Sequence, residues 1–357
     1  MIAFLVHNLA PYGTQAVLRD LVTAARRGDD CLVITVDPIP RPAIDLPADV
    51  RVVCLERQRT GVVGLATAAL RLARVMRRER ITSVLSFLPY GNILAVLGNV
   101  VAGRPARVVL TEHSSPDPDR RGTGAIRLLC RITYRRANAV AAVSAAVADD
   151  IARRYRLDRA GIEVIHNPVD VDRIRSRAEA PESHPWLHDG RPVVVCVAGL
   201  LPAKGHDTLI RALAMNSCRE LRAVIIGDGP ARSALTKLAA DCGVADRVDF
   251  VGYHANPHAF VRRATALVLP TRREGFGLVL IEAACVGTPV IASRVGGIPE
   301  LVPRFAPGLL VEPGDVDDLA DALEAVTTRS VSFGVVGVDA FQPATVWAHY
   351  RALLLGQ

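Results

Sequence analysis

Short apolar runs alternate along the chain with longer segments whose apolar residues recur at helical spacing. The short runs are typical of buried β-strands, and the longer segments are typical of amphipathic helices that cover a sheet. Strands that alternate with helices are joined by crossover connections, which favour parallel pairing. The pattern therefore predicts an α/β protein built on parallel sheets.

The predicted strands form two sets of similar organisation, one in each half of the chain. Those of the first half cover residues 2–6, 31–36, 84–87, 108–111, 139–143 and 163–165. Those of the second half cover residues 193–198, 223–226, 248–251, 266–269, 289–292 and 309–311. Between the two sets, residues 166–170 (HNPVD) lead into a polar, proline-containing stretch that reaches Pro192. We interpret this stretch as the junction of two domains, for which 357 residues are sufficient.

Residues 270–302 hold the features that are most informative about chemistry. Glu274 and Glu282 are separated by seven residues, and Gly275 and Gly277 follow the first acid. The strand predicted at 266–269 ends just before Glu274, which places this acid at the sheet edge where ligands bind in open α/β folds. A helix is predicted to begin near Gly277, and Glu282 lies about one turn into it.

These residue types suit a ligand that carries phosphate and hydroxyl groups. Glycines let backbone N–H groups approach a ligand closely, and the start of a helix favours an anion. A carboxylate accepts two hydrogen bonds at once, which suits the vicinal hydroxyls of a sugar or a ribose. The alternative is structural, with Glu282 an acid on the helix surface and Glu274 an acid that matches the helix dipole.

With its Gly-Thr-Pro turn at 287–289 and its Gly-Gly turn at 296–297, this segment resembles the Glu-x7-Glu signature of retaining glycosyltransferases of family 4. Residues 167–170 (NPVD) resemble the Asn-Pro-x-Asp hinge of the same family. The resemblance implies the GT-B fold, in which two Rossmann-like domains have a cleft between them. It implies an acceptor domain over 1–167, a nucleotide-sugar donor domain over 168–341, and a last helix, about 342–357, that packs back on the first domain.

The activity implied by the resemblance is transfer of a hexosyl unit from a nucleotide-diphospho-sugar to an acceptor hydroxyl, with retention at the anomeric carbon. Family frequency favours a UDP-sugar as donor. A lipid-linked glycan and a small aglycone such as an aminocyclitol both fit as acceptor. Two other functions stay open: a nucleotide-sugar epimerase of the same fold, and a non-catalytic protein that binds sugar nucleotides or anionic lipid.

The resemblance assigns the following residues to the donor site: Glu274, Lys204, Glu282, Gly275, Phe276, Gly277, Gly199, Gly227 and Gly229. Glu274 would bind hydroxyls of the donor sugar, Glu282 would bind the ribose, and the amides of residues 275–277 would hold phosphate and sugar. Gly227 and Gly229 form a Gly-Asp-Gly turn that would lie near the nucleotide, although turn chemistry alone also explains them.

Lys204 lies in the loop after the strand predicted at 193–198, where its charge would neutralise a diphosphate leaving group. This loop departs from the family pattern. Leu200 stands where the family has an arginine, and the loop is one residue short. The departure predicts that another arginine substitutes, that Lys204 acts alone, or that phosphate binding is weakened.

The first half of the chain offers fewer candidates. Gly13 and Tyr12 lie in the loop after the first strand, at the position of a family loop that faces the acceptor, and Tyr12 replaces the first glycine of that loop. His113 follows the strand predicted at 108–111 and would orient the donor sugar. Its neighbour Glu112 is predicted to point into the cleft and act on the acceptor.

The net charge of +7 belongs to the first half of the chain. Through Asn167 there are 24 Lys and Arg against 15 Asp and Glu, whereas the remainder has 19 against 21. Arginines at helical spacing around residues 71–78 and 127–135 could meet anionic lipid or a phosphate-bearing acceptor, or form an ordinary solvated surface. Aromatic residues make up only 4% of the chain, which argues against a nucleic-acid partner.

The remaining composition bears on location and metal content. The seven cysteines are scattered without a Cys-x-x-Cys pair, which favours a reducing compartment. No signal peptide is evident, so we expect a cytoplasmic protein, with membrane association at the cytoplasmic face as an option. Residues 170–172 (DVD) have a metal-binding spacing but lie at the predicted junction. We therefore predict no cofactor and no metal.

Overall fold

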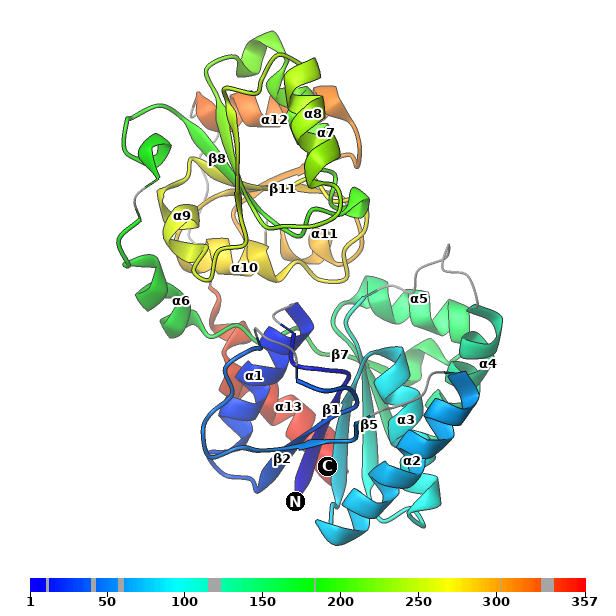
Figure 1. The fold of residues 1–357 in the computed structure, drawn as a ribbon. Helices are drawn as coiled ribbons and strands as arrows, with labels where there is room; N and C mark the ends of the chain where they lie inside the picture. Colours follow the sequence, from blue (N-terminus) through cyan, green and yellow to red (C-terminus); the bar gives the residue numbers. More distant parts are fainter. Residues whose placement is uncertain are drawn as a thin grey trace. The chain divides into compact units, whose positions relative to one another are not determined.

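The computed structural model describes residues 1–10, 13–39, 43–56, 61–114, 123–182, 184–302, 304–328 and 337–357. The chain forms two compact units, Met1–Val169 with Ala340–Gln357, and Asp170–Asp339 (Figure 1). Each unit contains one parallel sheet with helices, so the predicted α/β class is confirmed.

The first unit has a sheet in the order β3-β2-β1-β4-β5-β6-β7. Its strands are β1 (Ile2–Val6), β2 (Cys31–Thr35), β3 (Arg51–Cys54), β4 (Ser83–Phe87), β5 (Arg107–Glu112), β6 (Ala139–Ala142) and β7 (Ile162–Val164). The helices between them are α1 (Gly13–Ala25), α2 (Gly61–Arg78), α3 (Leu88–Val101), α4 (Thr123–Tyr134) and α5 (Ala145–Tyr155). All strand pairs are parallel, beginning with Ile2 opposite Cys31.

The last helix of the chain, α13 (Pro343–Leu355), belongs to this first unit. Ser83 Oγ donates to the carbonyl of Leu354 at 3.0 Å, and Arg107 Nε donates to the carbonyl of Leu353 at 2.6 Å. The Trp347 ring lies 5.5 Å from that of Phe4 in β1. These contacts fasten the C-terminal helix against the central strands of the first sheet.

The second unit has a sheet in the order β10-β9-β8-β11-β12-β13. Its strands are β8 (Val193–Val197), β9 (Arg222–Ile226), β10 (Val248–Gly252), β11 (Ala266–Leu269), β12 (Val290–Ser293) and β13 (Gly308–Val311). Its helices are α6 (Val171–Ala178), α7 (His206–Leu213), α8 (Arg232–Asp241), α9 (His258–Arg263), α10 (Leu278–Cys285), α11 (Ile298–Leu301) and α12 (Val316–Thr327). Residues of β8, β9, α7 and α12, among them Cys196, Ile225, Leu209 and Leu323, form its hydrophobic core.

In both sheets the strand order reverses at one point, between β1 and β4 in the first unit and between β8 and β11 in the second. The loops that leave the carboxyl ends of these strands diverge to opposite sides of the sheet, and open α/β sheets bind ligands there. The loops after β8 and β11 carry Lys204 and Glu274. The topology therefore brings the two most informative sequence motifs to one place.

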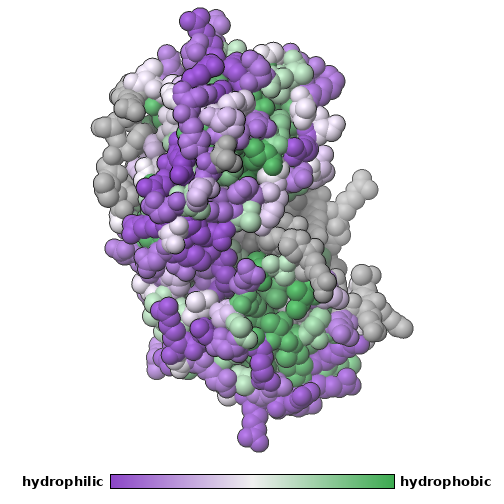
Figure 2. Space-filling view, turned by 60° about the vertical axis from the view of Figure 1, so that its left-hand side comes forward, coloured by the Kyte–Doolittle hydropathy of each residue, from purple (hydrophilic) through white to green (hydrophobic). Residues whose placement is uncertain are grey.

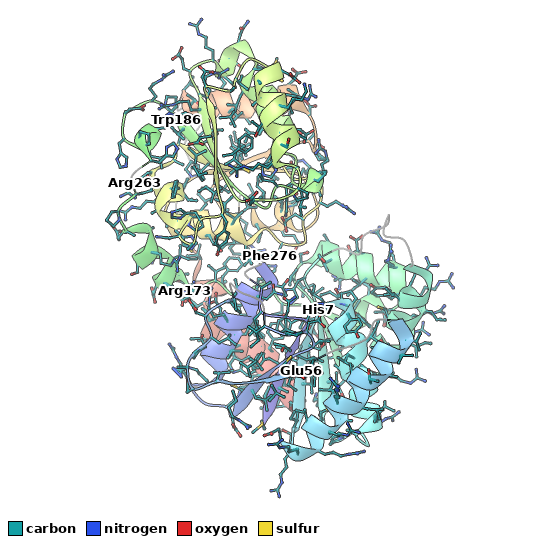
Figure 3. The ribbon with its side chains drawn as sticks, in the orientation of Figure 1. His7, Glu56, Arg173, Trp186, Arg263 and Phe276 are labelled. Atoms are coloured by element: carbon teal, nitrogen blue, oxygen red, sulfur yellow. The ribbon has the colours of Figure 1, made fainter. Side chains whose placement is uncertain are left out.

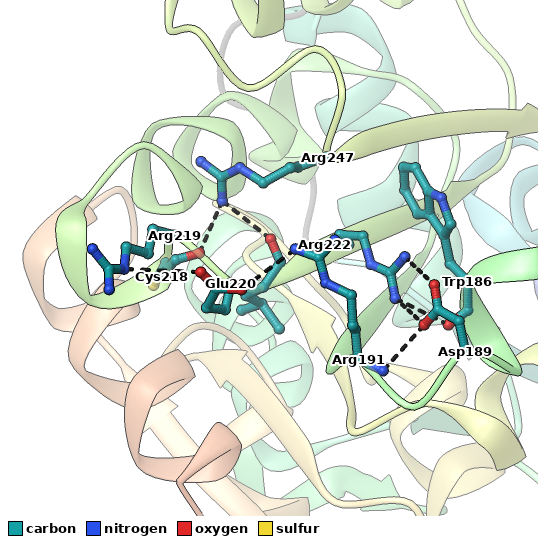
Figure 4. Close-up of polar contacts among 9 residues, drawn as sticks. Trp186, Asp189, Arg191, Cys218, Arg219, Glu220, Arg222 and Arg247 are labelled. Atoms are coloured by element: carbon teal, nitrogen blue, oxygen red, sulfur yellow. Dashed lines mark hydrogen bonds and ion pairs between the residues drawn. The ribbon is translucent and has the colours of Figure 1, made fainter.

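The amino edge of the second sheet is held by a different set of contacts, shown in Figure 4. Arg222, the first residue of β9, donates from Nη1 and Nη2 to the Asp189 carboxylate at 2.6 and 2.5 Å. Its guanidinium also lies 5.1 Å from the centre of the Trp186 ring. This bidentate pair joins the segment before β8 to the amino end of β9, at the opposite edge of the sheet from Lys204. Figure 3 labels Trp186 in that segment.

All the predicted strands are present with small shifts. The structure also contains β3, which the sequence pattern did not predict. Its sequence, RVVC, is partly exposed at the edge of the first sheet, so it lacks the longer apolar run of a buried strand. The strand predicted at 163–165 is Ile162–Val164. The helix predicted near Gly277 begins at Leu278, directly after that glycine.

Apolar and basic residues share parts of the surface of the first unit. Figure 2 shows hydrophobic residues, in green, gathered in one region of the face that it draws. Val62 on α2 and Leu128 on α4 are 84% and 56% exposed. Arg71 donates to the carbonyl of Leu55 at 2.6 Å, so this arginine of the predicted basic face supports the fold. Within the described residues, no helix combines the length and apolar character needed to cross a membrane.

Candidate donor site

Loops from separate strands approach one another closely at the carboxyl edge of the second sheet. A Cβ atom on Gly205 would lie 1.9 Å from the carbonyl oxygen of Pro270, and one on Gly296 would lie 1.7 Å from that of Glu274. Both glycines also have positive φ, +68° and +52°. Only glycine satisfies both conditions, so these residues let the loops after β8, β11 and β12 touch.

The glycines predicted at the nucleotide lie in the same group of loops. A Cβ atom on Gly227 would meet the carbonyl oxygen of Ala198 at 2.0 Å, and one on Gly229 would meet that of Leu200 at 2.6 Å. Gly199 faces the carbonyl of Asp228. Their close packing is explained by the contact between the β8 and β9 loops, and contact with a nucleotide stays a prediction.

Lys204 and Glu274 form an ion pair across the point where the strand order reverses. Lys204 Nζ lies 2.8 Å from Glu274 Oε2, and the Gly275 amide donates to Glu274 Oε1 at 3.2 Å. The two side chains are 26% and 18% exposed. A cation and a carboxylate are thus held together at the sheet edge, where the first can bind phosphate and the second can accept sugar hydroxyls.

The N-terminus of α10 lies directly after this pair in the chain. Gly277 is the N-cap with φ +90°, and no side chain among the described residues caps it. Phe276, labelled in Figure 3, is only 2% exposed, and its predicted contact with a ligand stays a prediction. The start of α10 therefore offers an N-terminal dipole beside a lysine, a setting that favours an anion.

Glu282 lies on the second turn of α10 and is partly buried. Its Oε2 is 3.8 Å from Nδ1 of His258, the first residue of α9. The sequence did not predict this neighbour, which lies 24 positions earlier in the chain. Binding of a ribose by Glu282 stays a prediction.

Leu200 is fully buried in the hydrophobic core of the second unit. Its amide donates to the carbonyl of Asp228 at 3.0 Å, and its carbonyl accepts from the amide of Ala231 at 3.1 Å. The side chain at this position therefore serves packing and cannot face a phosphate. Lys204 is the one cationic residue among residues 198–205, and its binding of phosphate stays a prediction.

His113 is buried and held from both ring nitrogens within the first unit. Nε2 lies 3.0 Å from Thr111 Oγ1, and Nδ1 lies 3.1 Å from Asn167 Oδ1. The ring stacks on Phe87, with centroids 5.3 Å apart. Burial lowers the pKa of His113 to about 4, so the ring is neutral near pH 7. Its predicted contact with a sugar hydroxyl would require it to exchange one of these partners.

The structure does not support the expectation that Glu112 faces the acceptor. The Glu112 side chain is fully buried, and its Oε1 accepts from Asn92 Nδ2 at 3.1 Å and from the Tyr134 hydroxyl. Burial raises the pKa of the carboxyl to about 8. Glu112 is the last residue of a strand that is buried along nearly its whole length, and its side chain contacts Asn92 of α3 and Tyr134 of α4 in the core.

The other acceptor candidates are less informative. Gly13 is exposed and is the first residue of α1. Tyr12 lies outside the described residues. In the part of the chain that the structure describes, no three His, Cys, Asp or Glu residues are grouped as metal ligands.

Sequence reasoning missed one pair that borders the site. Arg272, two residues before Glu274, donates to both carboxylate oxygens of Asp207 at 2.8 and 2.7 Å. The two residues are 65 positions apart, and neither stands out from its neighbours in charge or spacing. Only the approach of the two loops reveals the pair.

Comparison with known proteins identifies the class. The profile of the family described as "Glycosyltransferase Family 4" matches residues 12–173, and that of "Glycosyl transferases group 1" matches residues 179–330. The 2-deoxystreptamine N-acetyl-D-glucosaminyltransferase of Streptomyces fradiae is 32% identical over 342 residues, which cover 87% of this chain and 81% of that protein. The chain therefore belongs to family 4 of the glycosyltransferases.

Other relatives match over shorter stretches. The GDP-mannose-dependent alpha-(1-6)-phosphatidylinositol monomannoside mannosyltransferase of Mycobacterium tuberculosis is 40% identical over 196 residues, 50% of each chain. The D-inositol 3-phosphate glycosyltransferase of Nocardia farcinica is 35% identical over 263 residues, 69% of this chain and 56% of that protein. The chain thus spans about half the length of these two relatives.

Solved structures share the fold. Anabaena Alr3699/HepE in complex with UDP and glucose has a TM-score of 0.79 at 20% identity, covering 100% of this chain and 99% of that one. The lipopolysaccharide outer core galactosyltransferase WaaB in its apo form has a TM-score of 0.78 at 21% identity, covering 99% of each chain. The predicted GT-B fold is confirmed.

Proposed function

We propose that this protein is a retaining glycosyltransferase that moves a hexosyl unit from a nucleotide-diphospho-sugar to an acceptor hydroxyl. The observation that carries the proposal is the Lys204–Glu274 pair, held at 2.8 Å beside the start of α10. A lysine and a helix N-terminus suit the diphosphate of the donor, and a carboxylate suits the hydroxyls of its sugar. Membership of family 4 supports the same chemistry.

In the proposed reaction, the bond between the anomeric carbon and the diphosphate oxygen breaks, and a bond from that carbon to the acceptor oxygen forms on the same face. The acceptor proton passes to the departing diphosphate. Lys204 would leave Glu274 to bind the phosphate, so the donor would replace the ion pair with two new contacts. The residues stabilise the charge of the leaving group and orient the reactants. We propose that this proceeds without a metal.

The relatives narrow the substrates to be tried. The relative aligned over 87% of this chain and 81% of its own length is named for 2-deoxystreptamine, and another is named for D-inositol 3-phosphate. Both acceptors are six-membered carbocycles that carry hydroxyl groups. We therefore propose a cyclitol acceptor in preference to a lipid-linked glycan. UDP-N-acetylglucosamine is the first donor to test, ahead of GDP-mannose.

The test is an incubation of purified protein with UDP-N-acetylglucosamine, UDP-glucose or GDP-mannose and either cyclitol, followed by mass spectrometry. Glu274→Gln should abolish product, and Lys204→Ala should form it at a strongly reduced rate. Lys237→Ala, which removes an exposed lysine on α8 that pairs with Asp241, is the matched control and should retain activity. Conversion of a donor without acceptor would favour the epimerase, and tight nucleotide binding without turnover would favour the non-catalytic alternative.

A further inference from the structure

The burial of Leu200 makes the position of Lys204 critical. The loop at residues 198–205 contains no other cation. A single ammonium group neutralises a diphosphate effectively only if it is held at the right place, because an error of about 1 Å can cost about 100-fold in rate. The contacts that fix the lysine come from the neighbouring loop after β11.

Arg272 holds the loop on both sides of Lys204. Before the lysine, Arg272 Nη1 donates to the carbonyl of Pro202 at 2.8 Å, and the Arg272 amide donates to the carbonyl of Ala203 at 2.8 Å. After it, the guanidinium forms the bidentate pair with Asp207 and also lies 3.3 Å from Thr208 Oγ1. Arg272 therefore forms hydrogen bonds to the residues on both sides of Lys204 and Gly205.

The same arginine is close in the chain to the other member of the ion pair, in a segment that Thr271 ties to the Lys204 loop. Arg272 precedes Glu274 by two residues, and Thr271 Oγ1 bridges the carbonyls of Ala203 and Arg273 at 2.9 Å each. The planar fork of an arginine fixes direction as well as distance, which a lysine in its place would not do. Side-chain hydrogen bonding to Arg272 also lowers the pKa of Asp207, which keeps this acid ionised and paired.

We propose that Arg272 is a positioning residue that sets Lys204 against Glu274 and thereby forms the diphosphate subsite of this chain. The inference rests on the proposed function, since it concerns the same donor site. Without the guanidinium, the Pro202 carbonyl and the Asp207 carboxylate lose their partner. The loop then keeps its main-chain contacts, the hydrogen bond from Thr271 to the Ala203 carbonyl and the Lys204–Glu274 pair. The Asp207 carboxylate, three residues from Lys204, loses the guanidinium that compensates its charge. Binding of the diphosphate is weakened, while contacts to the nucleoside are kept.

The experiment is a double-mutant cycle of nucleotide binding measured by calorimetry. The dissociation constants of UDP and UMP, and of GDP and GMP, are measured for the wild type, Arg272→Ala, Lys204→Ala and the double variant. Arg272→Ala should weaken the diphosphate about tenfold, which is about 1.4 kcal/mol, and change the monophosphate about twofold at most. In the Lys204→Ala background the same change should have almost no further effect, because Arg272 acts through the lysine.

A matched pair of milder variants separates positioning from general stability. Asp207→Asn weakens the Arg272 fork, whereas Asp189→Asn weakens the equivalent Arg222 fork at the opposite edge of the same sheet. Only Asp207→Asn should reduce the preference for the diphosphate. Arg272→Lys keeps the charge without the fork and should also lose most of that preference.

The outcomes distinguish this inference from the proposed function. If the wild type binds neither diphosphate, the proposed function fails, and the inference fails with it. If the wild type binds a diphosphate but Arg272→Ala weakens diphosphate and monophosphate equally, or adds its full effect to Lys204→Ala, only the positioning role is overturned. The melting temperature of each variant shows whether it is folded.

Discussion

The buried carboxyl of Glu112 makes the stability of the first unit depend on pH in a way that one substitution can remove. The group is fully buried, and its pKa is raised from the ordinary 4.5 to about 8 by loss of solvation. The hydrogen bonds from Tyr134 and Asn92 offset only part of that effect. The folded protein therefore keeps the proton in a range where the unfolded chain releases it.

The sign follows from linkage. A raised pKa in the folded state gives a contribution to stability that is complete below 4.5 and is lost as the pH rises to about 8. Each pH unit within that window lowers the free energy of unfolding by about 1.4 kcal/mol. Between pH 5 and pH 8 the free energy of unfolding therefore falls by at most about 4 kcal/mol. In Glu112→Gln, the side-chain amide oxygen would accept the same two hydrogen bonds, and the amide cannot ionise. The variant should therefore gain stability relative to the parent as the pH rises.

The assay is urea unfolding followed by tryptophan fluorescence at about pH 5 and about pH 8. The chain has two tryptophans, and Trp347 packs in the first unit. A Trp186→Phe background thus leaves a reporter of that unit alone. Glu163→Gln, an exposed acid on β7, is the matched control and should show no such trend. A free-energy difference between Glu112→Gln and its parent that stays constant across this range would refute the reasoning.

The remaining predictions concern the donor site. Glu282→Ala should raise the donor KM more than Lys204→Ala does, whereas Lys204→Ala should mainly lower kcat; the reverse pattern in steady-state kinetics would undo the assigned roles. Gly296→Ala should lower kcat/KM by about tenfold or more, because its methyl group would displace the main chain of Glu274. Gly287→Ala, also at positive φ but in open space, should cost about 1 kcal/mol of stability without loss of activity, and an equal loss in both would argue against a specific effect. EDTA should leave the activity unchanged, and inactivation reversed by added Mg²⁺ would contradict the metal-independent reaction.

Several parts of this account were accessible from the sequence because they are local in the chain. Glu274, the glycines after it and the start of α10 lie within a few residues of one another, and the order of strands and helices gives the parallel sheets. The sequence also shows that Leu200 stands where the family has an arginine. The burial of its side chain could not be predicted, because burial depends on the packing of the whole unit.

What the sequence did not reveal depends on contacts between distant segments. The pairing of Arg272 with Asp207 requires the loops after β8 and β11 to meet, which the glycine at 205 permits. The predicted orientation of the Glu112 side chain is wrong because the last residue of a strand can face either the sheet edge or the core. Asn92 and Tyr134, which bind it, lie on two helices that precede and follow its strand.

The central claim is that Lys204 and Glu274 form the donor site of a retaining transferase. The most direct test is to determine by NMR the anomeric configuration of the product formed from UDP-N-acetylglucosamine and 2-deoxystreptamine, with Glu274→Gln as the inactive comparison. We expect a glycoside with the configuration of the donor, formed by the wild type only. A product of inverted configuration, or equal product from Glu274→Gln, would contradict it.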